Sequence, residues 1–428
     1  MAKDLTQPLK LETNKLMDTK NVIAAISLSA LVIVLYSLFF APPPREINNQ
    51  NNNIVKKEKE SNDTSPTIKN KTESEKISRN DAISLDNRVR IENDSIVGSI
   101  SLKGAIIDDL TFKKYTTKID SSENVTLLNP NNSSNGYFIE SGWVSTDKNI
   151  ELPNNSTEWK IEGNSKLTPD NPVKLKWINK QGIIFTNTFQ IDNKYLFKLN
   201  QKIENKTDKI FDFYPYAQII RNIKPDVTNF YILHEGLIGV FDENLEEKDY
   251  DDIEEEKFET TSSSGWLGIT DKYWITAIVP DKNKKFKSEF VYQKKYKANF
   301  IITEPIESKP NQIIENNTKI FAAAKEVEII DRYAESENIN KFDLAIDWGW
   351  FYFFTKPLFF IIDYFFKLTG NFGIAIILIT ACIRIIFFPL ANYSFKSMAK
   401  MKILAPEMAR LKELHKDDKT KLQQEMMG

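Results

Sequence analysis

The stretch FGIAIILITACIRIIFFPL, residues 372–390, contains 19 residues and a single charged side chain, Arg384. At ~1.5 Å per residue, a helix of this length crosses the hydrocarbon core of a bilayer, which is about 30 Å thick. We therefore predict a transmembrane helix over 372–390. The other segments of the chain can be assigned by working outward from this helix.

A second apolar run, residues 22–40, lies near the N-terminus and contains no charge. It is long enough to span a bilayer, and the lysines before it favour a cytoplasmic location for residues 1–21. A cleavable signal peptide is the alternative. In the sequence FFAPPP at 39–44, two phenylalanines precede the alanine and three prolines follow it, unlike the A-x-A-like pattern of a cleavage site, and the apolar run is long, so we favour an uncleaved anchor.

A third apolar segment precedes residues 372–390, and it carries a polar stripe. Gly349, Lys356, Asp363 and Lys367 fall within about 40° of one another on a helix at ~100° per residue. We predict an amphipathic helix over 343–367 that lies in the membrane interface, although its length would also allow it to span.

The charges of the C-terminal tail decide between these topologies. A basic tail follows the apolar run, with Lys396, Lys400, Lys402, Arg410, Lys412, Lys416, Lys419 and Lys421. Two spans, 22–40 and 372–390, return this tail to the cytoplasm and leave everything between them exported, in agreement with the positive-inside rule. A third span would export the tail.

The exported region divides into a linker and a β domain. Residues 41–81 are rich in Asn, Lys, Glu and Ser and poor in apolar side chains, which predicts a flexible linker. Residues 82–335 contain short runs of alternating apolar and polar residues, which predict an antiparallel β-sandwich. A more helical stretch, 322–333, is expected to close it. The runs are 89–91, 175–178, 183–189, 197–204, 211–216, 273–279 and 286–292.

The composition excludes several kinds of chemistry. A net charge of −2 gives no overall reason to expect nucleic-acid binding. The single cysteine, Cys382, and two histidines provide neither a disulfide nor a Cys/His metal cluster. No nucleotide-binding, nucleophile-elbow or metal motif is found, so we expect no cofactor, no metal and no enzymatic activity.

Arg384 is the most informative residue, because an arginine inside an apolar span costs about 2.5–3.5 kcal/mol on insertion scales. One interpretation is that it faces a hydrated groove and attracts an acidic or polar guest. The other is that it extends to the headgroups about one turn away, and the residues leave both open. Thr380 shares its helical face and Asn392 lies about 80° round, which would suit a groove wall, although a threonine also commonly bonds its own helix.

Beyond Pro389, a basic amphipathic helix is predicted, with Met398, Met401, Leu404 and Met408 at helical spacing. It would form one arm of a partial helical hairpin over 395–428. Methionines adapt to varied partners, so a docking surface is one interpretation, with ordinary packing or lipid binding as the alternatives.

Several ordered motifs resemble the YidC insertase family. GWLGITDKYWITAIVP at 265–280 and HEGLIGVF at 234–241 resemble its exported-domain signatures, while DWGW at 347–350 and KPL at 356–358 are similar to its interfacial helix. The motifs GNFG at 370–373, SMAKM at 397–401 and QQEMM at 423–427 resemble its first conserved core helix and cytoplasmic hairpin.

The resemblance implies an inner-membrane insertase and chaperone with a periplasmic β-supersandwich and a five-helix core. Its groove arginine corresponds to Arg384, with Thr380 and Asn392 beside it. A surface with Lys400, Met401, Lys402 and Arg410 is implied to contact the ribosome or the signal-recognition targeting machinery. The implied partners are nascent membrane proteins, the Sec translocon and the lipid bilayer, without a specific nucleic-acid sequence.

The chain departs from the family pattern because it stops at Gly428, partway through the hairpin. We therefore expect a fragment or truncated reading frame, with the family's other four transmembrane helices absent. Two alternatives belong to other classes: a membrane-anchored periplasmic carbohydrate-binding or carbohydrate-processing β-sandwich, with a cleft of convergent carboxylates and aromatics, and a purely structural scaffold. Neither needs a charge at position 384.

Overall fold

The computed structural model describes residues 77–226, 233–282, 284–349 and 351–414. The predicted transmembrane helix over 22–40 and most of the predicted linker over 41–81 lie outside these residues. The last three linker residues, 79–81, belong to a short helix, α2 (Arg79–Ser84), which is capped by the side chain of Ser78.

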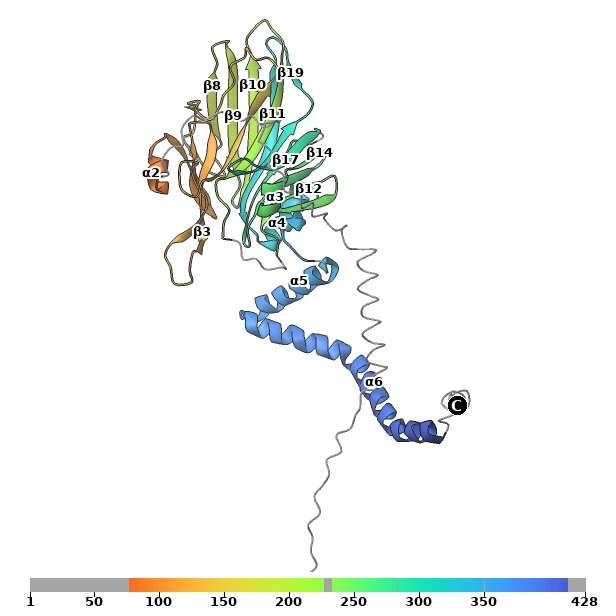
Figure 1. The fold of residues 1–428 in the computed structure, drawn as a ribbon. Coiled ribbons are helices and arrows are strands. Elements are labelled where there is room, and N and C mark those ends of the chain that lie inside the picture. Colours follow the sequence, from red (N-terminus) through yellow and green to blue (C-terminus); the bar gives the residue numbers. More distant parts are fainter. Residues whose placement is uncertain (1–76, 227–232, 283, 350, 415–428) are drawn as a thin grey trace, which may run out of the picture. The chain divides into compact units, whose positions relative to one another are not determined.

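Two large sheets form the domain that follows, and their strands are almost entirely antiparallel (Figure 1). The eleven-stranded sheet has the order β14-β17-β18-β11-β5-β3-β2-β1-β7, with β19 beside β11 and β4 beside β3. Its strands are β1 (Arg88–Glu92), β2 (Ile96–Ser101), β3 (Ile106–Thr116), β4 (Asn124–Leu128), β5 (Tyr137–Ser145), β7 (Lys166–Leu167), β11 (Phe211–Arg221), β14 (Phe258–Ser262), β17 (Phe286–Tyr292), β18 (Tyr296–Ile302) and β19 (Ile306–Ser308).

The second sheet has nine strands in the order β13-β12-β15-β16-β20-β10-β9-β8-β6. The short helix α3 (Tyr250–Glu255) follows β13. The strands of this sheet are β6 (Lys160–Glu162), β8 (Val173–Ile178), β9 (Ile183–Ile191), β10 (Leu196–Asn205), β12 (Gly236–Phe241), β13 (Asn244–Asp249), β15 (Gly265–Thr270), β16 (Trp274–Val279) and β20 (Ile313–Ala324).

The alternating residues of β10 show why this sequence forms a sandwich. Phe197, Leu199 and Ile203 are at most 1% exposed, while Lys198 on the opposite face is exposed. One face of each sheet is therefore apolar and contributes to a single hydrophobic core that takes side chains from both sheets. The predicted β-sandwich is confirmed.

The predicted helical stretch 322–333 is wrong in its first part. Ala322, Ala323 and Ala324 belong to β20, where they pair with residues 274–276 of β16 and are at most 3% exposed. Cross-strand pairing and burial outweigh the helix propensity of alanine here. The helix α4 (Val327–Ser336) begins three residues later.

The amphipathic segment predicted over 343–367 is divided in the structure. A 3₁₀ turn, η1 (Phe342–Ala345), comes first, and the helix α5 (Tyr352–Thr369) follows. Gly349, with φ of 69°, lies between them, in a left-handed conformation that a residue with a side chain seldom adopts.

The last described element is α6 (Phe372–Leu414), a single helix that continues through Pro389 and Pro406. It changes direction along its length (Figure 1), as expected where a proline removes a backbone hydrogen bond. Among the described residues, Phe372–Pro406 is the one segment long and apolar enough to cross a membrane. The first part of the predicted hairpin, from residue 395, is helical through Leu414, and the rest of that prediction lies outside the described residues.

Candidate functional site

The predicted groove residues all lie on α6. Ala375 and Ile379 are buried, at 0% and 7% exposure, whereas Thr380 and Arg384 are exposed. At ~100° per residue, Arg384 lies about 180° from Ala375 around the helix axis. Thr380 and Arg384 therefore share the face opposite the buried stripe, and exposed Asn392 lies about 80° from Arg384.

The two groove candidates differ in their bonding. The Thr380 hydroxyl donates to the carbonyl of Ile376 at 2.7 Å, which is the intrahelical bond expected for a threonine without a special role. Arg384 has no ion pair or hydrogen bond with any residue that the structure describes. Its guanidinium is available to a partner outside the described chain, to water or to headgroups.

The residues assigned to a ribosome-contact surface do not share one face of α6. Lys400, Met401 and Lys402 are consecutive and so lie about 100° apart around the axis, and Arg410 is about 180° from Met401. All four are exposed, Met401 at 68%. Helical spacing along α6 therefore does not bring all four together.

The structure shows a charged cluster that sequence reasoning found only in part. The Lys356 Nζ of α5 lies 3.1 Å from Asp331 of α4 and 3.0 Å from Asp343 of η1. The Lys356 ammonium also lies 5.7 Å from the Trp348 ring centroid and 5.6 Å from that of Tyr352. Burial lowers the pKa of Lys356, but the two carboxylates outweigh it and raise the pKa overall.

A second lysine on the same stripe repeats this contact near the C-terminal end of α5. Lys367 pairs with Glu328 of α4, and its Nζ lies 2.8 Å from Asp363 within α5. The polar stripe therefore faces α4 and η1. The acidic partners were missed, although the spacing of Glu328 and Asp331 by three residues on the amphipathic α4 was a usable signal.

Part of the remaining surface of α5 is aromatic and solvent-accessible. It presents side chains that are 44% to 75% exposed. Such a helix has charged contacts on one face and an unpartnered apolar face beside them. The exposed residues are Phe353, Phe354, Ile361, Tyr364 and Leu368.

The signature segments meet near the start of this region. The backbone N–H of His234 donates to Asp347 Oδ2 at 3.1 Å, and Asp347 Oδ1 accepts from the N–H of Gly349 at 2.8 Å. The HEGLIGVF segment is thereby bonded to the chain that leads into α5. Burial lowers the pKa of nearby Lys325 to about 8.

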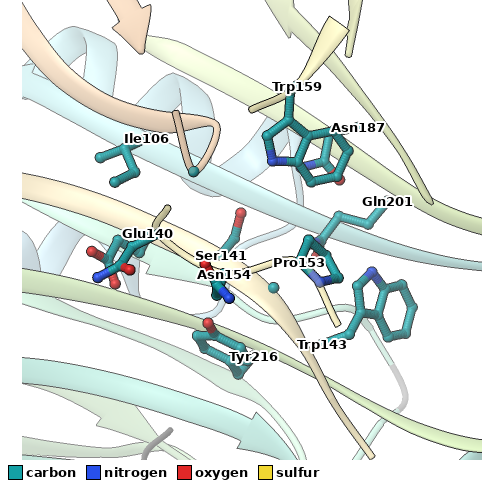
Figure 2. Close-up of a pocket in the computed structure, with 13 residues that line it drawn as sticks. Ile106, Glu140, Ser141, Trp143, Pro153, Asn154, Trp159, Asn187, Gln201 and Tyr216 are labelled. Atoms are coloured by element: carbon teal, nitrogen blue, oxygen red, sulfur yellow. The ribbon is translucent and has the colours of Figure 1, made fainter. Parts of the chain in front are cut away.

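The β domain offers little room for a carbohydrate ring between Trp143, Trp159 and Tyr216 (Figure 2). The cavity among them holds about 20 Å³, space for about one water molecule. Trp159 Nε1 and Gln201 Nε2 line it and are buried without a hydrogen-bond partner, which suits an ordered water.

A larger cleft of about 540 Å³ is lined by both signature segments, and several of its side chains bond to or pack against other residues of the domain. Asp271 lies 2.7 Å from Arg221, and Glu235 accepts the backbone N–H of Lys272 at 3.0 Å. The Trp274 ring stacks on Phe112, with centroids 4.8 Å apart. These contacts explain the position of Arg221, Glu235, Asp271 and Trp274 in the cleft as part of the folded domain, without a bound ligand.

Two protein families match consecutive parts of the chain. The YidC periplasmic domain family matches residues 88–361, and the 60Kd inner membrane protein family matches residues 364–428. Together they cover the β domain, α4, α5 and α6.

Full-length relatives give the same assignment. A protein of Pelagibacter ubique named membrane protein insertase YidC is 57% identical over 412 residues, 96% of this chain and 74% of the relative. Proteins of the same name from Rickettsia akari and Mesorhizobium japonicum are 43% and 42% identical, over 80% and 82% of this chain. The chain spans 62% and 59% of these two relatives.

Solved structures are similar to this chain only at a low level. A galactose mutarotase related enzyme from Lactobacillus acidophilus has a TM-score of 0.38 and 10% identity, covering 55% of this chain and 97% of its own. A galactose mutarotase-like protein from Lactobacillus casei has a TM-score of 0.37 and 8% identity, covering 55% and 100%. Likeness at this level says nothing about activity.

Proposed function

Because the chain belongs to the YidC membrane protein insertase family, we propose that it takes part in inserting, folding and assembling inner-membrane proteins. The match to an insertase at 57% identity over 96% of the chain is the observation that carries this proposal. The proposed substrates are nascent membrane proteins, received alone or together with the Sec translocon. An enzymatic role in carbohydrate chemistry has no comparable support.

We further propose a topology with two spans in this chain, 22–40 and 372–390. Residues 1–21 and the basic part of α6 would lie in the cytoplasm, and the β domain in the periplasm. Helix α5 would lie on the periplasmic interface. The pairing of Lys356 and Lys367 with α4 and η1 supports this, because the lysines face protein while the aromatic face remains exposed.

Arg384 is proposed to act in a hydrophilic groove, with Thr380 and Asn392 at its wall. The face that carries Arg384 is opposite the buried stripe of α6, so other helices of the full-length family core can cover it. A cation held there attracts the acidic or polar part of an incoming chain while the apolar part enters lipid. The cytoplasmic end of α6, with Lys400, Met401, Lys402 and Arg410, is proposed to meet the ribosome and targeting machinery.

The test is an insertion assay in the full-length protein with substrates whose translocated segments differ in acidity. Arg384→Ala is expected to impair insertion of the acidic substrates, whereas Arg384→Lys keeps the charge and should retain most of it. Wild-type insertion of every substrate by the alanine variant would support simple extension of Arg384 to the headgroups instead. Membrane content of each variant, measured by immunoblot, separates lost function from lost protein.

A further inference from the structure

The turn between β3 and β4 places an apolar side chain where turns ordinarily carry polar ones. The N–H of Ser121 donates to the carbonyl of Lys118 at 3.1 Å, which closes a four-residue turn. Ile119 is at the second position of this turn and is 99% exposed. Gly, Pro, Asn, Asp and Ser dominate such positions, so a fully exposed isoleucine there is unusual.

The hairpin that carries this turn is fixed at Tyr115, close to the end of β3. The Tyr115 hydroxyl donates to Glu326 at 2.9 Å, and the Tyr115 ring packs edge-on against Trp274, with centroids 5.2 Å apart. Glu326 also accepts the Tyr195 hydroxyl at 2.7 Å. The turn cannot swing away from Glu326 without breaking these contacts.

Glu326 also lies close in sequence to the residues of α4 that bind α5. It precedes α4, whose Glu328 pairs with Lys367 of α5. The hairpin continues beyond Tyr115, so Ile119 projects from the end of the β domain that binds α5. The loop after β3 can be followed in Figure 1, extending beyond the strands.

Exposure alone does not single out Ile119, because Ile178 and Ile313 are each 55% exposed. Those two residues lie at the other end of the domain, on neighbouring strands. Ile178 pairs with residue 184 of β9, which pairs with residue 204 of β10, and residue 204 pairs in turn with Ile313. Ile119 differs by its position beside the attachment of α5.

We propose that the β3–β4 turn is a second contact of the domain with the surface of the phospholipid bilayer, with Ile119 inserted among the headgroups. The proposal rests on the proposed interfacial position of α5. The Nζ of Lys113 forms an ion pair with Glu92 at 3.4 Å. The other charged residues of the loop have a net charge of zero, because Lys114 and Lys118 balance Asp120 and Glu123. Insertion therefore depends on the apolar side chain, and it is the same on zwitterionic and anionic lipid.

The experiment uses the full chain in proteoliposomes, in a Cys382→Ala background. A fluorophore on Ser122→Cys reports on the turn without replacing Ile119, and one on Lys180→Cys reports on the far end of the domain. Headgroup-attached nitroxide is expected to quench the label at 122 several-fold more than the label at 180. Ile119→Asp should reduce quenching at 122 to the level at 180.

A third label, on Phe353→Cys in α5, separates this proposal from the proposed function. Strong headgroup quenching at 353 with none at 122 overturns the turn contact while leaving the interfacial helix intact. Quenching at 122 that Ile119→Asp does not change, or that appears only with anionic lipid, also overturns it. Protection of 122 from aqueous iodide without headgroup quenching would mean that protein covers the turn, and it refutes the proposal equally.

Discussion

Replacing Lys356 by methionine removes one charge between two carboxylates and keeps a long, flexible side chain. The side chain of Lys356 is 18% exposed, and those of Asp331 and Asp343 are 28% and 20% exposed. Exposed ion pairs contribute about 0–1 kcal/mol, whereas breaking a buried pair costs about 3–5 kcal/mol. For this half-buried cluster we expect Lys356→Met to destabilise the contact of α5 with α4 and η1 by about 1–3 kcal/mol.

The chain offers a matched control on the same helix. Lys367 also pairs with α4, but Lys367 and Glu328 are 58% and 60% exposed, so water screens this pair and Lys367→Met should have little effect on stability. Both substitutions keep helix propensity nearly constant. Lys356→Arg should restore much of the stability, because the cation is retained.

Hydrogen exchange of the backbone amides of α4 in the reconstituted protein measures the effect directly. Because 1.4 kcal/mol changes an equilibrium constant tenfold, Lys356→Met should lower the protection factors of these amides by about 5- to 150-fold. Lys367→Met should leave them nearly unchanged. Equal loss in both variants, or no loss in either, would refute the assignment of Lys356 as the main contact.

The same contact has a defined pH dependence. Burial raises the pKa of Asp343, but hydrogen bonds from Tyr352 and Lys356 outweigh it, so the folded pKa lies below the ordinary value. Such a carboxylate stabilises the folded state fully above its unfolded pKa, about 3.9, and the contribution is lost as the pH falls through the folded pKa. The difference between wild type and Lys356→Met should therefore be constant near neutral pH and shrink below about pH 4.

Three further outcomes are expected. Cysteine at Lys180 should be labelled from the periplasmic side by a membrane-impermeant reagent and cysteine at Lys402 should not; the reverse would overturn the two-span topology. Gly265→Ala should destabilise the β domain by about 3 kcal/mol in urea unfolding, because a Cβ there would meet the carbonyl oxygen of residue 240 at 1.8 Å, while Gly163→Ala, with open space around it, should cost only about 1 kcal/mol. Deleting residues 80–304 from the full-length protein should leave insertion largely intact, since the sequence of the domain offers strands and turns but no convergent reactive groups; complete loss in an insertion assay would show that the domain takes part in insertion.

The local residue pattern was sufficient to predict those helices and strands in which all residues of one face have the same environment. Alternation in 197–204 predicted β10 because the residues on one face of that strand are buried, while those on the other face are only partly buried or exposed. The apolar run 372–390 predicted a helix for the same reason, since a bilayer imposes one requirement on every residue of a span. The polar stripe on α5 was likewise visible as a periodicity.

Contacts between distant segments could not be predicted in this way. Residues 322–324 have a helical composition, yet they form the end of β20 because Trp274 and its neighbours in β16 offer backbone partners and cover. The partners of Lys356 come from α4 and η1, 25 and 13 residues away, and no local spacing specifies which carboxylates a lysine will meet.

The same distinction between local pattern and distant contacts applies to the predicted site. Sequence alone determined that Arg384 is a charge within an apolar helix and that the chain resembles an insertase family, because both depend on residue identity and order. Only the tertiary structure decided that Arg384 lies opposite the buried stripe of α6, and that the polar face of α5 is directed at α4 and η1. Which face of a helix is covered depends on the neighbour that packs against it, and that neighbour is chosen by the whole fold.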